Sequence, residues 1–155
     1  MPADTPLSRL DAHYQGMPPV RALGLAVDGF DGDSLRLRAP LAANVNDKGC
    51  AFGGSLASLM TLAAWGRVWL GLEAEGLEAD IYVADSQLRY LAPLYDDLRA
   101  TATLAPDADW ASFLTALRTR GRGRVDLVAR VELPDGAPAT TFTARFAAIA
   151  RPPAG

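Results

Sequence analysis

The chain has 155 residues, of which 50% are hydrophobic and 21% are charged, with 15 basic and 18 acidic side chains and a net charge of -3. This composition predicts one domain over residues 1–155 and argues against disorder, and we expect the core of that domain to span about residues 20–151. It disfavours a nucleic-acid partner, because nucleic-acid binders are typically basic, and it contains no apolar run long enough to predict a membrane partner.

The first part of the chain predicts a hairpin followed by a loop and a long helix. Residues 1–19 form a short helix or a loose arm. Residues 22–30 alternate weakly and residues 34–39 alternate strictly between apolar and polar, which predicts two strands that pair as a hairpin. Residues 40–54 lack a period and contain several Asn and Gly residues, which indicates a loop. Residues 55–70 are apolar on nearly all sides, which predicts a buried helix that ends at Gly71.

The second part of the chain predicts four more strands joined by short links. Alternating residues favour strands over 81–91, 97–105, 124–133 and 140–150, and residues 107–119 form a helix or a strand, with helical spacing favoured. Short links make neighbouring strands antiparallel. We therefore expect an α+β domain in which one curved sheet wraps part of the helix, while a second copy of the chain covers the rest.

His13 and Cys50 are the only histidine and the only cysteine of the chain. They exclude an intrachain disulfide and argue against a Cys/His zinc site, so no metal is expected. A Ser-His-Asp triad would have to use His13, which falls in the N-terminal segment that we expect to be loose. A single free cysteine is typical of a reducing compartment, which predicts a cytoplasmic protein.

The loop before the long helix carries the segment NVNDKGCAFGGS, from Asn44 to Ser55. Its two glycines, Gly53 and Gly54, lie where the loop enters the helix. The first amides of a helix have no internal partner, and the helix dipole makes them a site for developing negative charge, as in an oxyanion hole. The alternative is that the glycine pair only allows the helix to pack closely.

The pattern Asn46-x-x-Gly49-x-x-Phe52-Gly53-Gly54 resembles the N-x-x-G-x-x-H-G-G signature of hot-dog acyl thioesterases. With Phe in the histidine position and Ser after the glycines, it is similar to the YiiD C-terminal-type thioesterase family, whose pattern reads N-x-N-x-x-G-T-x-F-G-G-S. Cys50 stands where that family usually has threonine. Further likeness lies at Ala84-Asp85, at Arg89-Tyr90-Leu91-x-Pro93 and at Arg120-Gly121-Arg122-x-Arg124-Val125, so the resemblance covers roughly residues 20 to 150.

The resemblance implies a hot-dog fold, in which a central helix is wrapped by an antiparallel sheet of five or six strands. It also implies a homodimer with two sites at the interface, or a dimer of dimers, and hydrolysis of acyl-CoA or acyl-carrier-protein thioesters in fatty acid metabolism without a cofactor. A non-catalytic module that binds the same acyl carriers is the alternative function. A hot-dog dehydratase or hydratase is disfavoured, because those relatives use a histidine within the motif.

Four residues are candidate catalytic groups: the Gly54 amide for the oxyanion, and Asn46, Thr61 and Asp85. Asn46 either orients water or the thioester, or braces the loop through local bonds. Thr61 takes the position where some relatives carry a helix carboxylate, and its alternative is a hydrogen bond to the preceding turn. The helix has no acid over 55–72, so the base is Asp85 or Asp47, with Asp85 favoured unless it only pairs with Arg89.

Further residues are expected to contact the substrate. Arg118, Arg120, Arg122 and Arg124 recur at every second position, so on a strand they would form one basic row for phosphate or an acidic carrier, or a solvated edge. A nucleophilic Cys50 is disfavoured, because free cysteines are more often small buried residues. Together with the motif, these considerations give the substrate-binding candidates Asn44, Asp47, Phe52, Gly53, Arg122 and Arg124.

Overall fold

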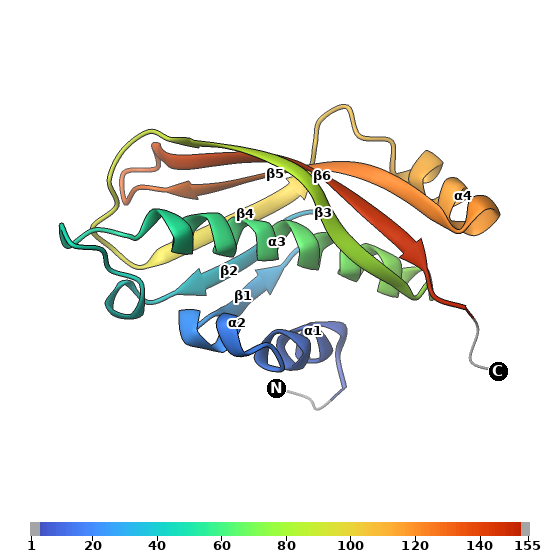
Figure 1. Ribbon diagram of the computed structural model, residues 1–155, viewed down its shortest axis with the longest axis horizontal. Helices are drawn as coiled ribbons and strands as arrows, with labels where there is room; N and C mark the ends of the chain where they lie inside the picture. Colours follow the sequence, from blue (N-terminus) through green and yellow to red (C-terminus); the bar gives the residue numbers. More distant parts are fainter. Residues whose placement is uncertain (1–3, 153–155) are drawn as a thin grey trace.

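The computed structural model describes residues 4–152 and shows a long helix lying against one strongly twisted sheet (Figure 1). The helices are α1 (Pro6–Gln15), α2 (Pro18–Leu23), α3 (Gly53–Ala74) and α4 (Trp110–Arg120), with a 3-10 turn at Leu41–Ala43. The strands are β1 (Ala26–Phe30), β2 (Leu35–Ala39), β3 (Ala79–Tyr90), β4 (Leu98–Leu104), β5 (Arg122–Glu132) and β6 (Pro138–Ala150).

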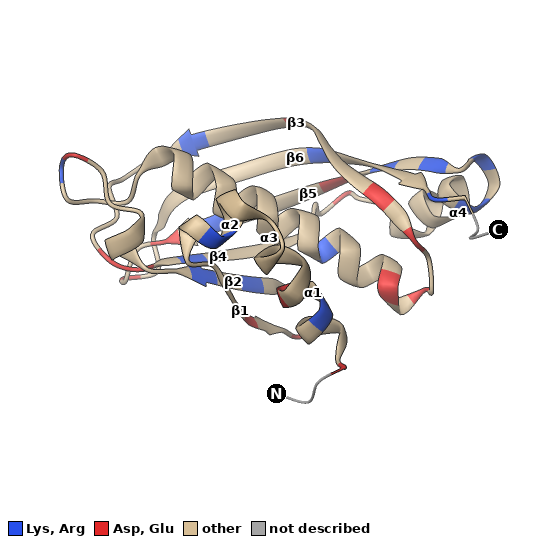
Figure 2. Ribbon diagram, turned by 60° about the horizontal axis from the view of Figure 1, so that its bottom comes forward, with Lys and Arg blue, Asp and Glu red and all other residues tan. Residues whose placement is uncertain are grey.

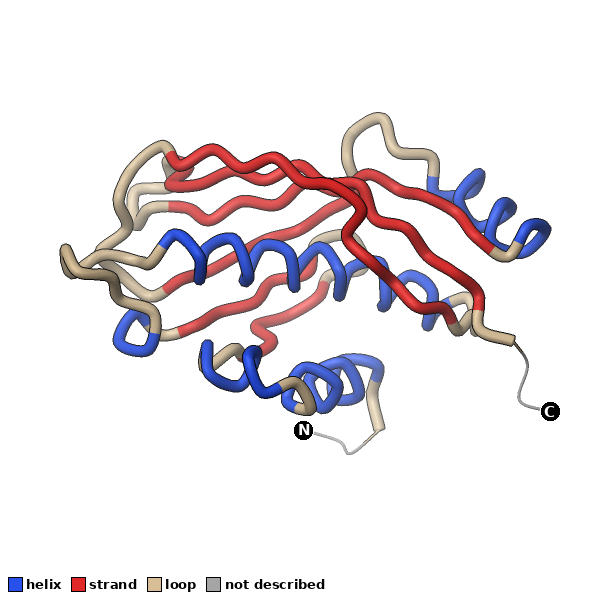
Figure 3. The backbone as a smooth tube through the Cα atoms, viewed as in Figure 1, coloured by secondary structure: helices blue, strands red, loops and turns tan. Residues whose placement is uncertain are grey.

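The sheet has six antiparallel strands in the order β1-β2-β4-β5-β6-β3, so β1 and β3 form its edges (Figure 3). The predicted hairpin is confirmed as β1 paired with β2. Residues 107–119, for which the sequence allowed either a helix or a strand, contain the helix α4. Each strand that sequence alternation predicted is present. The prediction of an α+β hot-dog domain with a central helix is therefore confirmed.

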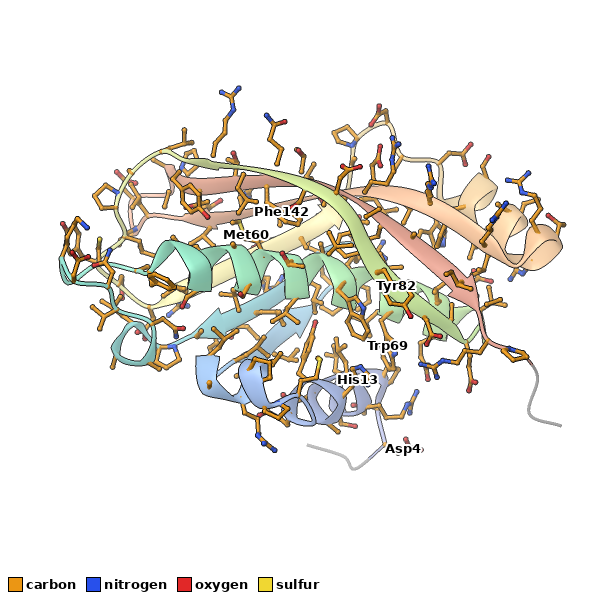
Figure 4. The ribbon with its side chains drawn as sticks, viewed as in Figure 1. Asp4, His13, Met60, Trp69, Tyr82 and Phe142 are labelled. Atoms are coloured by element: carbon orange, nitrogen blue, oxygen red, sulfur yellow. The ribbon has the colours of Figure 1, made fainter. Side chains whose placement is uncertain are left out.

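The core lies between α3 and one face of the sheet, which we call the inner face. Along β6, Phe142, Ala144 and Phe146 are buried on this face, and Thr143 and Arg145 lie on the opposite, outer face. Figure 4 shows Met60 of α3 near Phe142 of β6, and both side chains belong to one buried cluster. Each large apolar side chain buried in this way contributes about 1.5–3 kcal/mol, which fixes α3 against the sheet.

The N-terminal segment is ordered from Thr5 onward, so the expectation of a loose arm is wrong there. Thr5 and Ser8 form a capping box at the start of α1, in which each side chain bonds the backbone of the other residue. The buried Tyr14 donates a hydrogen bond from its hydroxyl to the carbonyl of Leu62 on α3, at 2.7 Å. This contact anchors α1 on the central helix.

The central helix does not end at Gly71, contrary to the sequence prediction, but continues to Ala74. The absence of a side chain at Gly71 lets the ring of Trp110 from α4 pack against the helix, since a Cβ there would lie 2.6 Å from its Cη2 atom. Tertiary packing therefore explains this glycine. The left-handed glycine of this region is Gly76, two residues beyond the end of the helix, with φ of 66°.

The four alternating arginines do not form one strand row, because a helix end separates them. Arg118 and Arg120 belong to the last turn of α4, and Gly121 ends that helix in the left-handed conformation with φ of 74°. Arg122 and Arg124 then begin β5 and lie on its outer face. Only these two arginines share a strand face, and Arg118 forms an ion pair with Glu75 at 3.0 Å.

Candidate functional site

The start of α3 is an uncapped helix end. Its N-cap residue is Phe52, which has no side-chain acceptor, and the first hydrogen bond into the helix runs from the Leu56 amide to the Phe52 carbonyl at 3.0 Å. The amides of Gly53, Gly54 and Ser55 precede that bond. These donors and the positive end of the helix dipole can stabilise a negatively charged oxygen.

Phe52 and Tyr90 surround the glycine pair. A Cβ at Gly54 would lie 2.5 Å from the Phe52 ring, so glycine is needed there for the ring to pack in this position. Tyr90 comes from the inner face of β3, and its hydroxyl donates a 3.2 Å hydrogen bond to the Gly53 carbonyl. Both aromatic rings are more than half exposed. Sequence reasoning missed Tyr90 as a site residue, although it lies in the Arg89-Tyr90-Leu91 segment that resembles the family.

Asn44 is a buried brace for the loop. Its side chain is 3% exposed, and its amide group donates to the carbonyls of Leu23 and Pro40, both at 2.8 Å. The Phe52 amide in turn donates to the Asn44 carbonyl at 2.7 Å. Since both amide hydrogens of Asn44 are used inside the protein, this residue positions the helix start and offers no free donor to a substrate.

Asn46 also makes the local bonds that were the alternative to a catalytic role. Its Oδ1 accepts hydrogen bonds from the amides of Lys48 at 2.8 Å and Cys50 at 3.1 Å, and its Nδ2 lies 3.2 Å from the Cys50 sulfur. The oxygen is therefore committed to the loop. The Nδ2 group carries a second hydrogen, so Asn46 both braces the loop and retains one donor.

Asp47 lies at the exposed tip of the same loop. Its carboxylate forms an ion pair with Lys48 at 2.9 Å, and this hydrogen-bonded cation lowers the pKa of Asp47 below its ordinary value. Asp47 is thus an ionised carboxylate at neutral pH. Cys50 is only 6% exposed, which agrees with the interpretation of this cysteine as a small buried residue.

Thr61 lies two turns after Gly54 on the same side of α3. Its hydroxyl donates to the Ala57 carbonyl at 2.8 Å, which is the hydrogen bond to the preceding turn that the sequence left open. The oxygen still has lone pairs to accept a hydrogen bond. Thr61 also lines two neighbouring cavities of about 450 and 320 Å³ along the exposed side of α3.

Asp85 is not brought to the start of α3. The pairing of β3 with β6 shifts between Val83 and Asp85, which places Asp85 opposite Arg145 on the outer face of the sheet. The ion pair of Asp85 with Arg89, which was the alternative to a catalytic role, is not formed within residues 4–152, where Arg145 pairs with Asp126 at 3.0 Å. Within one protomer, Asp85 therefore faces away from the glycine pair.

His13 lies on the surface of α1 against the central helix. Its imidazole stacks on the indole of Trp65, with ring centres 5.0 Å apart and planes inclined by 11°. Both residues line the 450 Å³ cavity that also contains Thr61. The sequence analysis disfavoured His13 because it falls in the N-terminal segment. The residues around His13 give no indication of its contact with Trp65, which lies 52 positions later in the chain.

A cavity of about 790 Å³ forms a groove between α4 and the outer face of β5 and β6. It is lined by four arginines and three aspartates: Arg120, Arg122, Arg124, Arg145, Asp107, Asp109 and Asp126. Within residues 4–152, Arg145 pairs with Asp126, and the other three arginines form no ion pair. Figure 2 shows Lys and Arg segments gathered at this end of the molecule. In one protomer the groove lies at the opposite end of α3 from Gly53 and Gly54 (Figure 1).

Within residues 4–152, no three His, Cys, Asp or Glu side chains are grouped so that they could hold a metal ion. No helix in this part of the chain has the length and apolar character that crossing a membrane requires.

A central helix wrapped by a six-stranded antiparallel sheet, with a glycine pair at the helix start, defines a hot-dog protein of the thioesterase class. A solved "putative thioesterase" from Shewanella oneidensis is 31% identical, with a TM-score of 0.83 over 93% of this chain and 97% of that one. A protein of unknown function from Chlorobaculum tepidum TLS is 30% identical, with a TM-score of 0.86 over 92% and 93%. A thioesterase from Haemophilus influenzae, 15% identical over 93% and 90% of the two chains, shares the fold with a TM-score of 0.70.

The family itself is defined by a match over most of the chain. Residues 9–150 match the family model described as "Putative thioesterase (yiiD_Cterm)". The chain belongs to this family, as its loop and helix motif indicated.

Proposed function

We propose that this protein hydrolyses an acyl thioester at the start of α3. The observation that carries the proposal is the uncapped helix end, where Phe52 leaves the Gly53 and Gly54 amides free. As water attacks the thioester carbon, the carbonyl oxygen gains negative charge, which these amides stabilise. The carbon–sulfur bond then breaks, giving a carboxylic acid and a thiol. Phe52 and Gly53 line the acyl side of this site.

Two polar residues of the loop, Asn46 and Asp47, complete the proposed mechanism. Thr61 lies seven residues after Gly54, about 10 Å along the helix axis, so it would contact the acyl chain and not the attacking water. Asn46 holds the loop and offers its remaining amide hydrogen to the substrate. Asp47 accepts the proton from water, because it lies on the loop that enters α3 whereas Asp85 lies on the outer face. With its pKa lowered by Lys48, Asp47 stays available as a base until the pH falls well into the acidic range.

The proposed assembly is a homodimer formed through β3. This strand is a 12-residue edge of the sheet, and exposed Tyr82, Val83 and Tyr90 lie along it. Free edges of this length pair readily with another strand. A two-fold axis across β3 would place the strands antiparallel and would bring the α4–β5 end of one protomer near the α3 start of the other.

The proposed carrier is coenzyme A or acyl-carrier protein in the cytoplasm. Arg122 and Arg124 would contact the phosphates of the carrier, because they line the groove together with Arg120 and form no ion pair within residues 4–152. In the dimer described above, that groove would lie within reach of the thioester. The free, buried Cys50 is consistent with a reducing compartment.

The experiment is a thiol-release assay on the purified protein. Acyl-CoA, acyl-carrier protein and acyl N-acetylcysteamine, which lacks phosphate, are supplied with acyl chains of graded length. We expect the phosphate-bearing substrates to have a lower KM than acyl N-acetylcysteamine. Their KM should rise with ionic strength, because salt screens the contact of phosphate with Arg122 and Arg124. Absence of thiol release with every chain length on every carrier would refute hydrolysis.

A second function is binding of the same acyl carriers without turnover. The observation that favours it is that α3 carries no acidic side chain or histidine over residues 53–72. In that case acyl-CoA would raise the melting temperature without releasing thiol. Both measurements on one sample therefore separate the two functions.

Asn46 gives a first test of the mechanism by substitution. Asn46→Ala should lower the free energy of unfolding by about 1–2 kcal/mol, because two backbone amides lose their acceptor. Asn46→Asp keeps that acceptor and should unfold near the wild-type temperature, yet lower kcat about tenfold or more by losing the donor and adding charge near the oxyanion. Wild-type kcat in Asn46→Asp would show that Asn46 only braces the loop.

A further inference from the structure

The exposed side of α3 forms the floor of an apolar furrow. Its floor residues, Thr61, Leu62, Trp65 and Trp69, follow Gly54 along one side of the helix. One wall is formed by His13 of α1 and by Met17, which precedes α2, and the other is the β3 edge with Ile81, Tyr82 and Val83. Figure 4 shows His13, Trp69 and Tyr82 gathered where these three elements meet.

The furrow continues toward the proposed site of hydrolysis. A neighbouring cavity of about 320 Å³ is lined by Ala57 and Ser58 and shares Thr61 and Leu62 with the first one, of about 450 Å³. Together they run along α3 from its first turns to Trp69. The far end is polar, because the ion pair of Arg151 with Asp80, at 2.9 Å, lies there.

Trp65 is held rigidly across this furrow. Its indole Nε1 donates a hydrogen bond to the Ile81 carbonyl at 3.0 Å, and the Tyr14 ring packs against it with centres 6.0 Å apart. His13 covers the same indole in a parallel stack. The two stacked rings come from α1 and α3, so they join the wall of the furrow to its floor at one point.

We propose that the furrow holds the acyl chain of the thioester and that the His13–Trp65 stack sets the chain length it accepts, an inference that rests on the proposed function. The helix start provides the site for the thioester head, and the lining of the furrow on α3 begins at Ala57, three residues after Gly54. Trp65 lies 11 residues after Gly54, about 16 Å along the axis. An extended chain covers that distance with roughly a dozen bonds, judged from the reach of an extended backbone.

The occupant is an acyl chain because the furrow is lined mainly by apolar side chains from Ala57 to Trp69. Its volume falls in the range of small-molecule sites, about 300–1,000 Å³. Its nearer cavity begins at Ala57 and Ser58, about one turn of α3 beyond the glycine pair where a thioester would bind. A second protomer paired along β3 would cover this furrow from the solvent side and complete its enclosure.

The test replaces His13 with a smaller and with a larger side chain. For each variant, kcat/KM is measured over a series of saturated acyl-CoA substrates. His13→Ala opens the wall, so chains longer than the wild-type optimum should gain about fourfold for each additional methylene group buried. His13→Trp fills the furrow and should shift the optimum to shorter chains. Arg21→Ala, on the exposed side of α2 and outside both cavities, is the matched control and should leave the chain-length profile unchanged.

A binding measurement separates this inference from the proposed function. The rise in melting temperature with free saturated fatty acids of graded length is recorded for the wild type and both variants. If no thioester is hydrolysed but the length dependence of binding still shifts, the furrow assignment holds and the hydrolase proposal fails. If hydrolysis occurs and both variants keep the wild-type profile, the inference is wrong. Loss of the dimer in His13→Trp with an unchanged profile would assign the furrow to subunit contact and would also overturn it.

Discussion

Gly66→Ala should lower the free energy of unfolding by about 3 kcal/mol, although alanine normally stabilises a helix interior by about 0.5–1 kcal/mol. Gly66 lies at the centre of α3, where α1 crosses the helix. A Cβ there would overlap the hydroxyl of Tyr14 and would lie 2.7 Å from the Cδ2 atom of Leu35. Tyr14 and Leu35 are both fully buried in a close-packed core, so neither side chain can move away from the added methyl group without disturbing its own neighbours.

The loss has a polar component as well as a packing one. The Tyr14 hydroxyl donates to the Leu62 carbonyl, and burial raises the pKa of Tyr14 well above its ordinary value, so the group remains a donor throughout the working pH range. An alanine methyl group would push this hydroxyl away from its acceptor. Leaving a buried polar group without its partner costs about 1–3 kcal/mol.

Urea denaturation of a double-mutant cycle tests this explanation. Tyr14→Phe alone should lose the hydrogen bond, and in combination with Gly66→Ala it should cost less than the sum of the two single changes, because the overlapping hydroxyl is gone. Ser58→Ala, on the exposed side of the same helix, should change stability by no more than about 0.5 kcal/mol. A Gly66→Ala variant as stable as the wild type would show that α1 does not pack on α3 in this way.

Much of the fold could be predicted because its periodicity is local. Strict alternation over 34–39 identified β2, and the uniformly apolar segment after Gly54 identified α3. The errors arose where tertiary contacts overrode local signals. Gly71 has the appearance of a helix stop but accommodates Trp110, and the alternating arginines suggest one strand but are divided by the turn at Gly121.

The candidate site was less predictable, because its geometry depends on the order of strands and on contacts distant in sequence. The glycine pair was found from the motif, since it acts through its own backbone. The face of Asp85 was not, because one irregularity in the pairing of β3 changes which side chains point inward. His13 was missed because its partner, Trp65, lies on another helix.

Phe52→Asp should have opposite effects on stability and activity. A carboxylate at the N-cap position can accept a hydrogen bond from the amide of Gly54 or Ser55, which typically stabilises a helix by about 1 kcal/mol. The backbone at this position is already extended, with φ of -65° and ψ of 131°. The protein shows the same cap elsewhere, since Asp109 accepts a 3.0 Å bond from the Ser112 amide at the start of α4.

The same cap would remove the donors that the proposed mechanism needs. An internal carboxylate would occupy the amides and place a negative charge where the oxyanion develops, so kcat/KM should fall by about 10²–10³-fold, as when an oxyanion-hole donor is lost. Phe52→Leu, which has no acceptor, should stay within a few-fold of the wild type. Because Phe52 is 54% exposed, neither change should disrupt the core.

Thermal unfolding and the thiol-release assay on the same three proteins decide between a catalytic and a structural role for the helix start. A structural role predicts that activity follows stability, so the better-capped Phe52→Asp variant would be at least as active as the wild type. A catalytic role predicts a more stable but nearly inactive Phe52→Asp and an active Phe52→Leu. Equal losses in both variants would instead assign the effect to the aromatic ring that packs over Gly54, and the amides would no longer explain the activity.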